Sequence, residues 1–115
     1  MKRNYRLYVE DILQCVDKID EFIGSMDFDA FVCDEKTNSA VIKKLEIIGE
    51  ASKRIPKSIT QKYKELPWKD MARMRDKISH DYFGINFKIV WKVIKERLPE
   101  IKPLLSKILN ETENS

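Results

Sequence analysis

The feature that most constrains this fold is a spacing of apolar residues by three and four positions, repeated along the chain. Between Asn4 and Gly24 one such stripe comprises Tyr5, Tyr8, Ile12, Val16, Ile19 and Ile23. This spacing places apolar side chains on one face of an amphipathic helix. Asn4 is a suitable N-cap, and Gly24 is a suitable helix end. We therefore predict a helix between these two residues.

A second predicted helix runs from about residue 35 to residue 55, after a connection over residues 25–35. Its core-facing stripe comprises Val41, Leu45, Ile48, Ser52 and Ile55. A glycine inside a helix costs about 1 kcal/mol relative to alanine, so Gly49 indicates a close approach by a neighbouring helix. Pro56 ends the helix, because the residue before a proline avoids the helical region.

Proline and glycine also set the predicted limits of the later helices. Ser58 can cap a short helix that ends near residue 66. Pro67 suits the first turn of a third long helix, and Gly84 suits its left-handed end. A fourth helix is predicted over residues 87–98. Pro99 is predicted to open a fifth, although Pro103 is unfavourable inside a helix and would suit a later start.

Turn-forming residues are scarce, because the 115 residues include only 3 Gly and 4 Pro. This scarcity favours helices over a many-stranded β fold. We predict an all-α, single-domain antiparallel bundle of about five helices over residues 1–110, with a polar tail over 111–115.

Cysteine usage and hydropathy limit the class of protein. No apolar run approaches the ~20 residues that span a bilayer, and residues 1–11 lack the apolar stretch of a signal peptide. We therefore expect a cytoplasmic protein without a membrane anchor. In a reducing compartment Cys15 and Cys33 are most simply a core residue and a loop or partly buried residue. With a single histidine they form no metal-ligand cluster, so we expect neither a metal site nor a cofactor.

The net charge of +3 hides an uneven distribution. Residues 10–36 hold nine acidic and two basic side chains, whereas residues 53–77 hold nine basic and three acidic ones. The basic region could attract a polyanion, and the acidic region could instead dock a basic partner. Charge alone favours an ordinary solvated surface over either of these.

The chemistry-bearing residues lie near the predicted end of the third helix. Arg75 and Tyr82 are seven positions apart and project together on a helix, and Ser79 lies one turn from Arg75 on the same side. His80, the single histidine, projects about 140° from Arg75 on an ideal helix. The two side chains converge only if the helix ends near His80, or if a second copy of the chain supplies the missing group.

Arginine and histidine together suit phosphodiester chemistry. Arginine offers a planar, permanently charged fork to phosphate oxygens, and histidine moves protons near neutral pH. A histidine at a helix C-terminus can also simply stabilise the helix dipole, and spacing alone favours that simpler role.

A polar stripe on the second helix comprises Lys43, Glu46, Glu50 and Lys53. It predicts an ion-paired face, in which Glu50 could instead meet an arginine of another helix.

At this point the chain resembles a known family. The Arg-x4-His-x-Tyr pattern of Arg75, His80 and Tyr82 is similar to the signature of HepT-like proteins in the HEPN superfamily. The resemblance extends to IIGEASKRIP at 47–56 and to DYFGINFKIVWKVIKERLPEI at 81–101, and it covers roughly Tyr5 to Leu109. HEPN domains often carry asparagine after the motif arginine, and here that position is Asp76.

The resemblance implies a homodimer in which two motifs face one another, and it leaves a higher assembly open. It implies a metal-independent ribonuclease toxin with His80 as general acid or base and Arg75 stabilising charge on the phosphate. RNA would be the substrate and DNA would not, since the nucleophile is the ribose 2′ hydroxyl. The implied partner is a minimal nucleotidyltransferase antitoxin that attaches AMP to Tyr82.

Supporting roles are expected for Ser79, Asp76 and Glu50, and Arg73 and Lys77 are expected to contribute RNA affinity. Two alternatives stay open at the level of sequence. The negative charge of Asp76 favours a catalytically weak nucleotide- or RNA-binding partner of the nucleotidyltransferase. The third possibility is a structural dimer, against which the Arg75, His80 and Tyr82 constellation argues.

Overall fold

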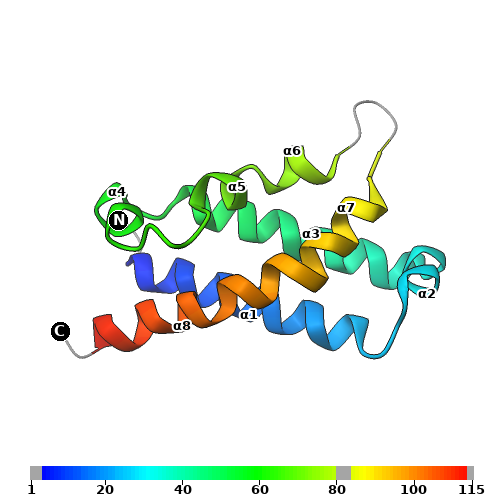
Figure 1. Ribbon diagram of the computed structural model, residues 1–115, viewed down its shortest axis with the longest axis horizontal. Helices are drawn as coiled ribbons and strands as arrows, with labels where there is room; N and C mark the ends of the chain where they lie inside the picture. The colour runs from blue at the N-terminus through cyan, green and yellow to red at the C-terminus, as the bar shows by residue number, and fades with distance from the viewer. Residues whose placement is uncertain (1–3, 80–83, 114–115) are drawn as a thin grey trace.

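The computed structural model describes residues 4–79 and 84–113, and this part of the chain is all-α. His80 and Tyr82 therefore lie outside the described residues. Figure 1 shows the elements, which are α1 (Tyr5–Ile23), α2 (Phe28–Cys33), α3 (Glu35–Lys53), α4 (Lys57–Lys62), α5 (Trp68–Ala72), α6 (Met74–Ile78), α7 (Phe87–Lys92), the π-helical η1 (Val93–Arg97) and α8 (Leu98–Glu113). Within the described ranges, the only β pairing is an isolated bridge between Ser79 and Ile85.

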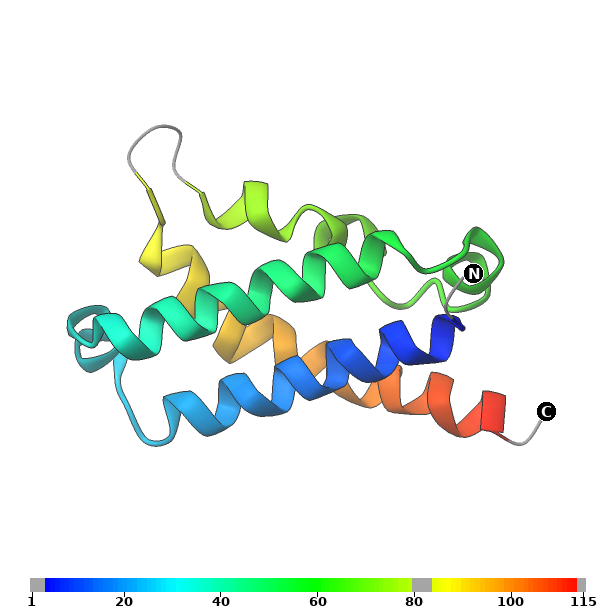
Figure 2. The same ribbon diagram turned by 180° about the vertical axis from the view of Figure 1, so that it is seen from behind.

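The long helices pack as an antiparallel bundle. α3 lies between α1 on one side and α5 and α6 on the other (Figure 2), while α8 packs against α1. The start of α1 and the end of α8 lie at the same end of the molecule (Figures 1 and 2). None of the helices that the structure describes is both long and apolar enough to cross a membrane. The prediction of an all-α bundle is confirmed.

α1 follows its predicted pattern closely. The Asn4 side chain accepts a hydrogen bond from the Arg6 N–H at 2.9 Å, which satisfies one of the free donors of the first turn. Gly24 ends the helix with a φ of 53°. The stripe is buried from Ile12 to Ile23, and Val9 joins it. Tyr5 and Tyr8 are half-buried and pack against the core.

Gly49 is the point at which α3 meets the α5–α6 segment. A Cβ atom at this position would lie 3.3 Å from the Met71 carbonyl oxygen and 3.4 Å from the Met74 Cβ. These separations leave little room for any side chain, because close-packed interiors adjust poorly to added volume. The predicted close approach at Gly49 is therefore confirmed.

The predicted third helix is broken into two short helices and ends earlier than predicted. Arg73 interrupts it between α5 and α6, and α6 ends at Ile78 because Ser79 is extended, with ψ of 146°. The Asn86 N–H donates to the Ile78 carbonyl at 2.8 Å, which satisfies an acceptor that a continuing helix would have used. Gly84 has a φ of 93°, as its predicted left-handed conformation requires, but α6 already ends at Ile78, so Gly84 does not cap that helix.

The fourth and fifth predicted helices form one continuous helical segment from α7 to α8, so the predicted start at Pro99 is wrong. A π turn precedes this proline, in which the Leu98 N–H bonds to the Val93 carbonyl five residues back. Pro99 and Pro103 both lack an N–H donor, yet both lie within α8. The helix continues through them because Leu98, Ile101 and Leu105 are buried in the core.

Two other local features differ from the sequence-based expectations. α2 forms inside the predicted connection, and α4 begins after Pro56 without a side-chain cap from Ser58.

α8 continues to Glu113, and the Glu111 carboxylate accepts a hydrogen bond from the buried Tyr63 hydroxyl. This bond, together with burial, raises the pKa of Tyr63 to about 12.

We predict that Gly49→Leu destabilises the protein by about 1–3 kcal/mol, because the added side chain forces α5 and α6 away from α3. The free energy of unfolding, measured by denaturant titration with helical circular dichroism, tests this. Ser39→Leu adds the same side chain at an exposed position of α3 and should change stability by less than about 0.5 kcal/mol. Equal effects of both changes would contradict the packing argument.

Candidate functional site

Arg75 lies on α6 in a segment whose end is fixed by local hydrogen bonds. The Arg75 carbonyl accepts the Ser79 hydroxyl at 2.8 Å and the Ser79 N–H at 3.2 Å. Both bonds close the last turn of α6, after which the backbone becomes extended. The Arg75 side chain is exposed, so its guanidinium is accessible to an anionic ligand.

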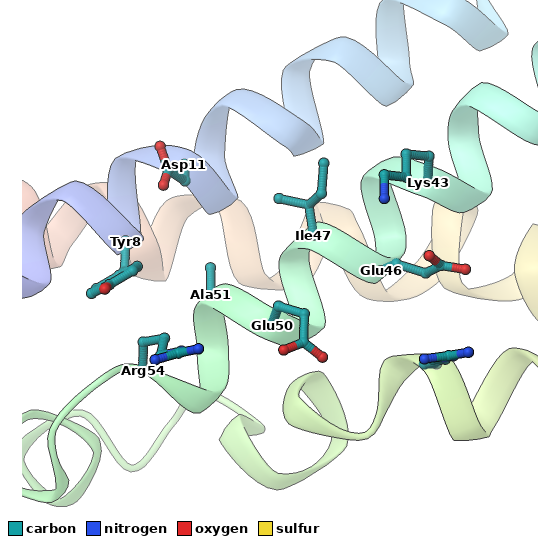
Figure 3. Close-up of a pocket in the computed structure, with 9 residues that line it drawn as sticks. Tyr8, Asp11, Lys43, Glu46, Ile47, Glu50, Ala51 and Arg54 are labelled. Carbon is teal, nitrogen blue, oxygen red and sulfur yellow. The ribbon is translucent and has the colours of Figure 1, made fainter.

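A groove of about 590 Å³ runs along α3, with α1 and α6 contributing to its walls. Its lining residues are Tyr8 and Asp11 from α1, Lys43, Glu46, Ile47, Glu50 and Ala51 from α3, Arg54 just after α3, and Arg75 from α6. Figure 3 shows eight of these by label, with Lys43 and Arg54 toward opposite ends of the groove. We call this feature the α3 groove.

The α3 groove carries equal numbers of opposite charges. Its lining includes the three cations Lys43, Arg54 and Arg75 and the three carboxylates Asp11, Glu46 and Glu50. At a distance these charges largely cancel, so the groove does not attract a polyanion through net charge. A phosphate would instead have to be bound locally, at the guanidinium of Arg75 or Arg54.

Glu50 lies in the same groove as Arg75, on the face of α3 where the sequence predicts a polar stripe. It forms an ion pair with Lys53 at 3.2 Å, and both side chains are more than half exposed. An exposed pair of this kind contributes a few tenths of a kcal/mol. The predicted ion-paired face is therefore present, and Glu50 is close enough to Arg75 to line one cavity with it.

The two residues predicted to add RNA affinity lie elsewhere on this segment. Arg73 is exposed at the junction between α5 and α6. Lys77 lines a separate hollow with residues of α7 and η1, and its ammonium lies 3.9 Å from Asp70. Asp76 is exposed on α6. Arg75 and Glu50 therefore line the same groove, whereas Lys77 lines a different hollow.

His80 and Tyr82, the other two members of the predicted motif, fall outside the described residues, so their predicted roles stay predictions. Within residues 4–79 and 84–113, no group of three or more His, Cys, Asp and Glu side chains is arranged to bind a metal. Cys15 is buried, which raises the pKa of its thiol, and Cys33 is exposed.

Several groove residues were not predicted as functional from the sequence. Arg54 continues the polar stripe of α3 one turn beyond Glu50, so its position could have been found from spacing alone. Tyr8 was assigned to the core stripe of α1, and nothing in the local sequence shows that it also borders a groove. Asp11 comes into the site only because α1 packs against α3.

Comparison with known proteins supplies independent information. A family model described as "Ribonuclease HepT-like" matches residues 12–108. The chain is 47% identical to a probable ribonuclease HepT of Thermococcus cleftensis, over 94% of this chain and 98% of that protein. It is 44% identical to a putative RNase of Methanocaldococcus jannaschii, over 99% of this chain and 98% of that protein. A putative RNase of Caldanaerobacter subterraneus subsp. tengcongensis is 41% identical, over 92% and 95% respectively. No solved structure matches the chain significantly.

Proposed function

The chain belongs to the ribonuclease HepT-like family, and we propose that it is an endoribonuclease that cleaves RNA at a site built around Arg75 and His80. The names of its relatives support an activity on RNA, since they are described as ribonucleases. The family resemblance, the exposed Arg75 and the position of the motif near the end of α6 support the choice of residues.

The observation that carries this proposal is the end of α6 at Ile78. On a continuous helix His80 would project about 140° away from Arg75. Ser79 has an extended backbone, with φ −82° and ψ 146°. The helical geometry that would point His80 away from Arg75 therefore stops before the histidine. With α6 ended before the histidine, helix geometry does not hold His80 on the far side of α6 from Arg75, so the pair can meet within one chain or across two copies of it.

The proposed reaction uses the substrate's own ribose as nucleophile. The 2′ oxygen forms a bond to phosphorus while the bond from phosphorus to the 5′ oxygen breaks, leaving a cyclic phosphate and a free 5′ hydroxyl. The 2′ hydroxyl loses a proton and the leaving 5′ oxygen gains one. His80 takes the first as general base or supplies the second as general acid, and water carries out the other transfer. Arg75 stabilises the charge that develops on the phosphate oxygens. DNA lacks the 2′ hydroxyl and is not a substrate.

We predict that His80→Ala lowers the rate of RNA cleavage by about 10²–10⁴-fold, the usual effect of losing a general acid–base group. Arg75→Ala should lower the rate and also weaken RNA binding, while Arg75→Lys should retain part of the binding because it keeps the charge. Cleavage of a labelled RNA in the presence of EDTA is the assay. Lys107→Ala, at an exposed position of α8, is the control and should behave as wild type. Activity that EDTA abolishes, or that survives in His80→Ala, would refute this mechanism.

We further propose that two copies form a twofold homodimer and that each site takes Arg75 from one subunit and His80 from the other. The charge-balanced α3 groove beside Arg75 supports self-association, since equal opposite charges can pair across a twofold axis.

Mixing two inactive variants tests this composite site. Random exchange between Arg75→Ala and His80→Ala subunits makes half of the dimers mixed, and each mixed dimer holds one intact composite site out of two. The expected recovery is therefore roughly a quarter of wild-type activity. If Arg75 and His80 act within one subunit, the mixture stays inactive, and a monomer in sedimentation velocity would exclude the composite site altogether.

The family resemblance supports a regulatory partner. We propose that the chain is the toxin of a toxin–antitoxin pair and that a minimal nucleotidyltransferase transfers AMP from ATP to the Tyr82 hydroxyl, releasing pyrophosphate. The anionic AMP group would then compete with RNA for the phosphate-binding side of Arg75.

Incubation with such a transferase and ATP should add the mass of AMP to the peptide containing Tyr82 and reduce RNA cleavage. Tyr82→Phe should take up no AMP and keep its cleavage activity. Modification of the Tyr82→Phe variant at the wild-type level would show that another residue is the acceptor.

A weakly catalytic binding module is the second candidate. The exposed carboxylate of Asp76 beside Arg75 and the three carboxylates of the α3 groove favour it, because they oppose charge accumulation on a phosphate. RNA binding without cleavage by the unmodified protein would select this candidate, and faster cleavage by Asp76→Asn would show that the carboxylate limits the reaction.

A further inference from the structure

A second hollow, of about 180 Å³, lies between α6 and the α7–η1 segment. It is lined by Lys77 from α6, Ile89 and Lys92 from α7, and Val93 and Arg97 from η1. Lys77 follows Arg75 by two positions and projects about 200° from it on an ideal helix. α6 therefore presents Arg75 toward the α3 groove and Lys77 toward this hollow, which we call the cationic hollow.

The cationic hollow differs in charge from the α3 groove. Three of the five lining side chains are cations, and none is a carboxylate. Two of the cations have a carboxylate partner outside the hollow: Asp70 lies 3.9 Å from Lys77, and Glu100 lies 3.6 Å from Arg97. Both carboxylates are more than 60% exposed, so water screens these pairs strongly. No ion pair of Lys92 is recorded within the part of the chain that the structure describes. The hollow is thus a local concentration of positive charge.

The π turn of η1 creates this concentration. Lys92 and Arg97 are five positions apart, and an α-helix would point them about 140° away from each other. In a π turn the hydrogen bonds join residues five positions apart, so such residues lie nearly above one another. The Leu98 N–H bond to the Val93 carbonyl shows this register. Lys92 and Arg97 consequently face the same hollow, with Val93 buried beneath them.

We propose that the cationic hollow is a phosphate-binding subsite for the backbone of the RNA substrate, beside the nucleotide that is cleaved. This inference rests on the proposed ribonuclease activity. A phosphate placed here would receive a guanidinium fork from Arg97 and the ammonium groups of Lys77 and Lys92. A strand crossing the exposed surface of α6 would place one phosphate at Arg75 and another at the hollow.

The chemistry of the hollow selects a polynucleotide. The exposed Lys92 and Arg97 and the half-buried Lys77 surround an apolar floor, and such cations attract the backbone of any sequence. They provide no buried polar group that would fix a small anion. The contribution to binding is therefore electrostatic, sequence-independent and dependent on salt, and these residues position the strand without taking part in the bond-breaking step.

The test removes the two cations that the π turn aligns. The variant Lys92→Gln/Arg97→Gln should bind a labelled 2′-O-methyl RNA more weakly than wild type. The slope of log affinity against log salt should fall in magnitude by about 0.7, since the hollow holds one phosphate and each single-strand phosphate contact contributes about 0.7. KM for RNA cleavage should rise while kcat stays unchanged. Lys36→Gln/Lys107→Gln removes the same charge at two exposed positions outside both cavities and should leave slope and KM at wild-type values.

The outcomes separate this inference from the proposed function. Wild-type protein that neither binds nor cleaves RNA would overturn both. Wild-type cleavage with an unchanged salt slope and KM in the Lys92→Gln/Arg97→Gln variant would overturn the subsite alone, as would an equal loss in the control variant. Inorganic phosphate and AMP are titrated in parallel. Tight binding of either one that disappears in the double variant would show a small-anion site instead of a strand-binding subsite.

Discussion

The contact between Gly49 and the backbone of α5 is the constraint on which the candidate site depends. Because Gly49 has no side chain, the Met71 carbonyl oxygen can lie 3.3 Å, and the Met74 Cβ 3.4 Å, from the point where a Cβ atom would stand. α6 then follows the polar face of α3, and Arg75 comes to line one groove with Glu46 and Glu50. A larger residue at position 49 would move α6 outward and separate the arginine from these carboxylates.

The two sides of α6 differ in charge for reasons that lie in the neighbouring helices. On one side α3 contributes Lys43 together with Glu46 and Glu50, and the charges of the groove balance. On the other side the π turn of η1 aligns Lys92 with Arg97 opposite Lys77. The chain's net charge of +3 describes neither surface, because attraction of a polyanion depends on how charges are distributed. The proposed path of RNA over α6 follows from this difference.

Predictions from sequence succeeded where a local interaction was sufficient. Asn4 caps α1 and Gly24 ends it, since both act through hydrogen bonds or backbone angles within a few residues. Predictions failed where another part of the chain supplied a hydrogen bond or buried the helix. α6 ends at Ile78 because the Asn86 N–H bonds to its carbonyl. The helix continues through Pro99 because burial of Leu98 and Ile101 offsets the missing donors.

The sequence by itself determined the fold class, the first helix, the close approach at Gly49 and the motif of Arg75, His80 and Tyr82, because periodicity, capping and residue type are local properties. Only the tertiary structure decided which side chains share a cavity. Arg54 and Asp11 join Arg75 through helix packing, and Lys92 meets Arg97 through a π turn. An ideal helix of 3.6 residues per turn places Lys92 and Arg97 apart, so no periodicity argument could have united them.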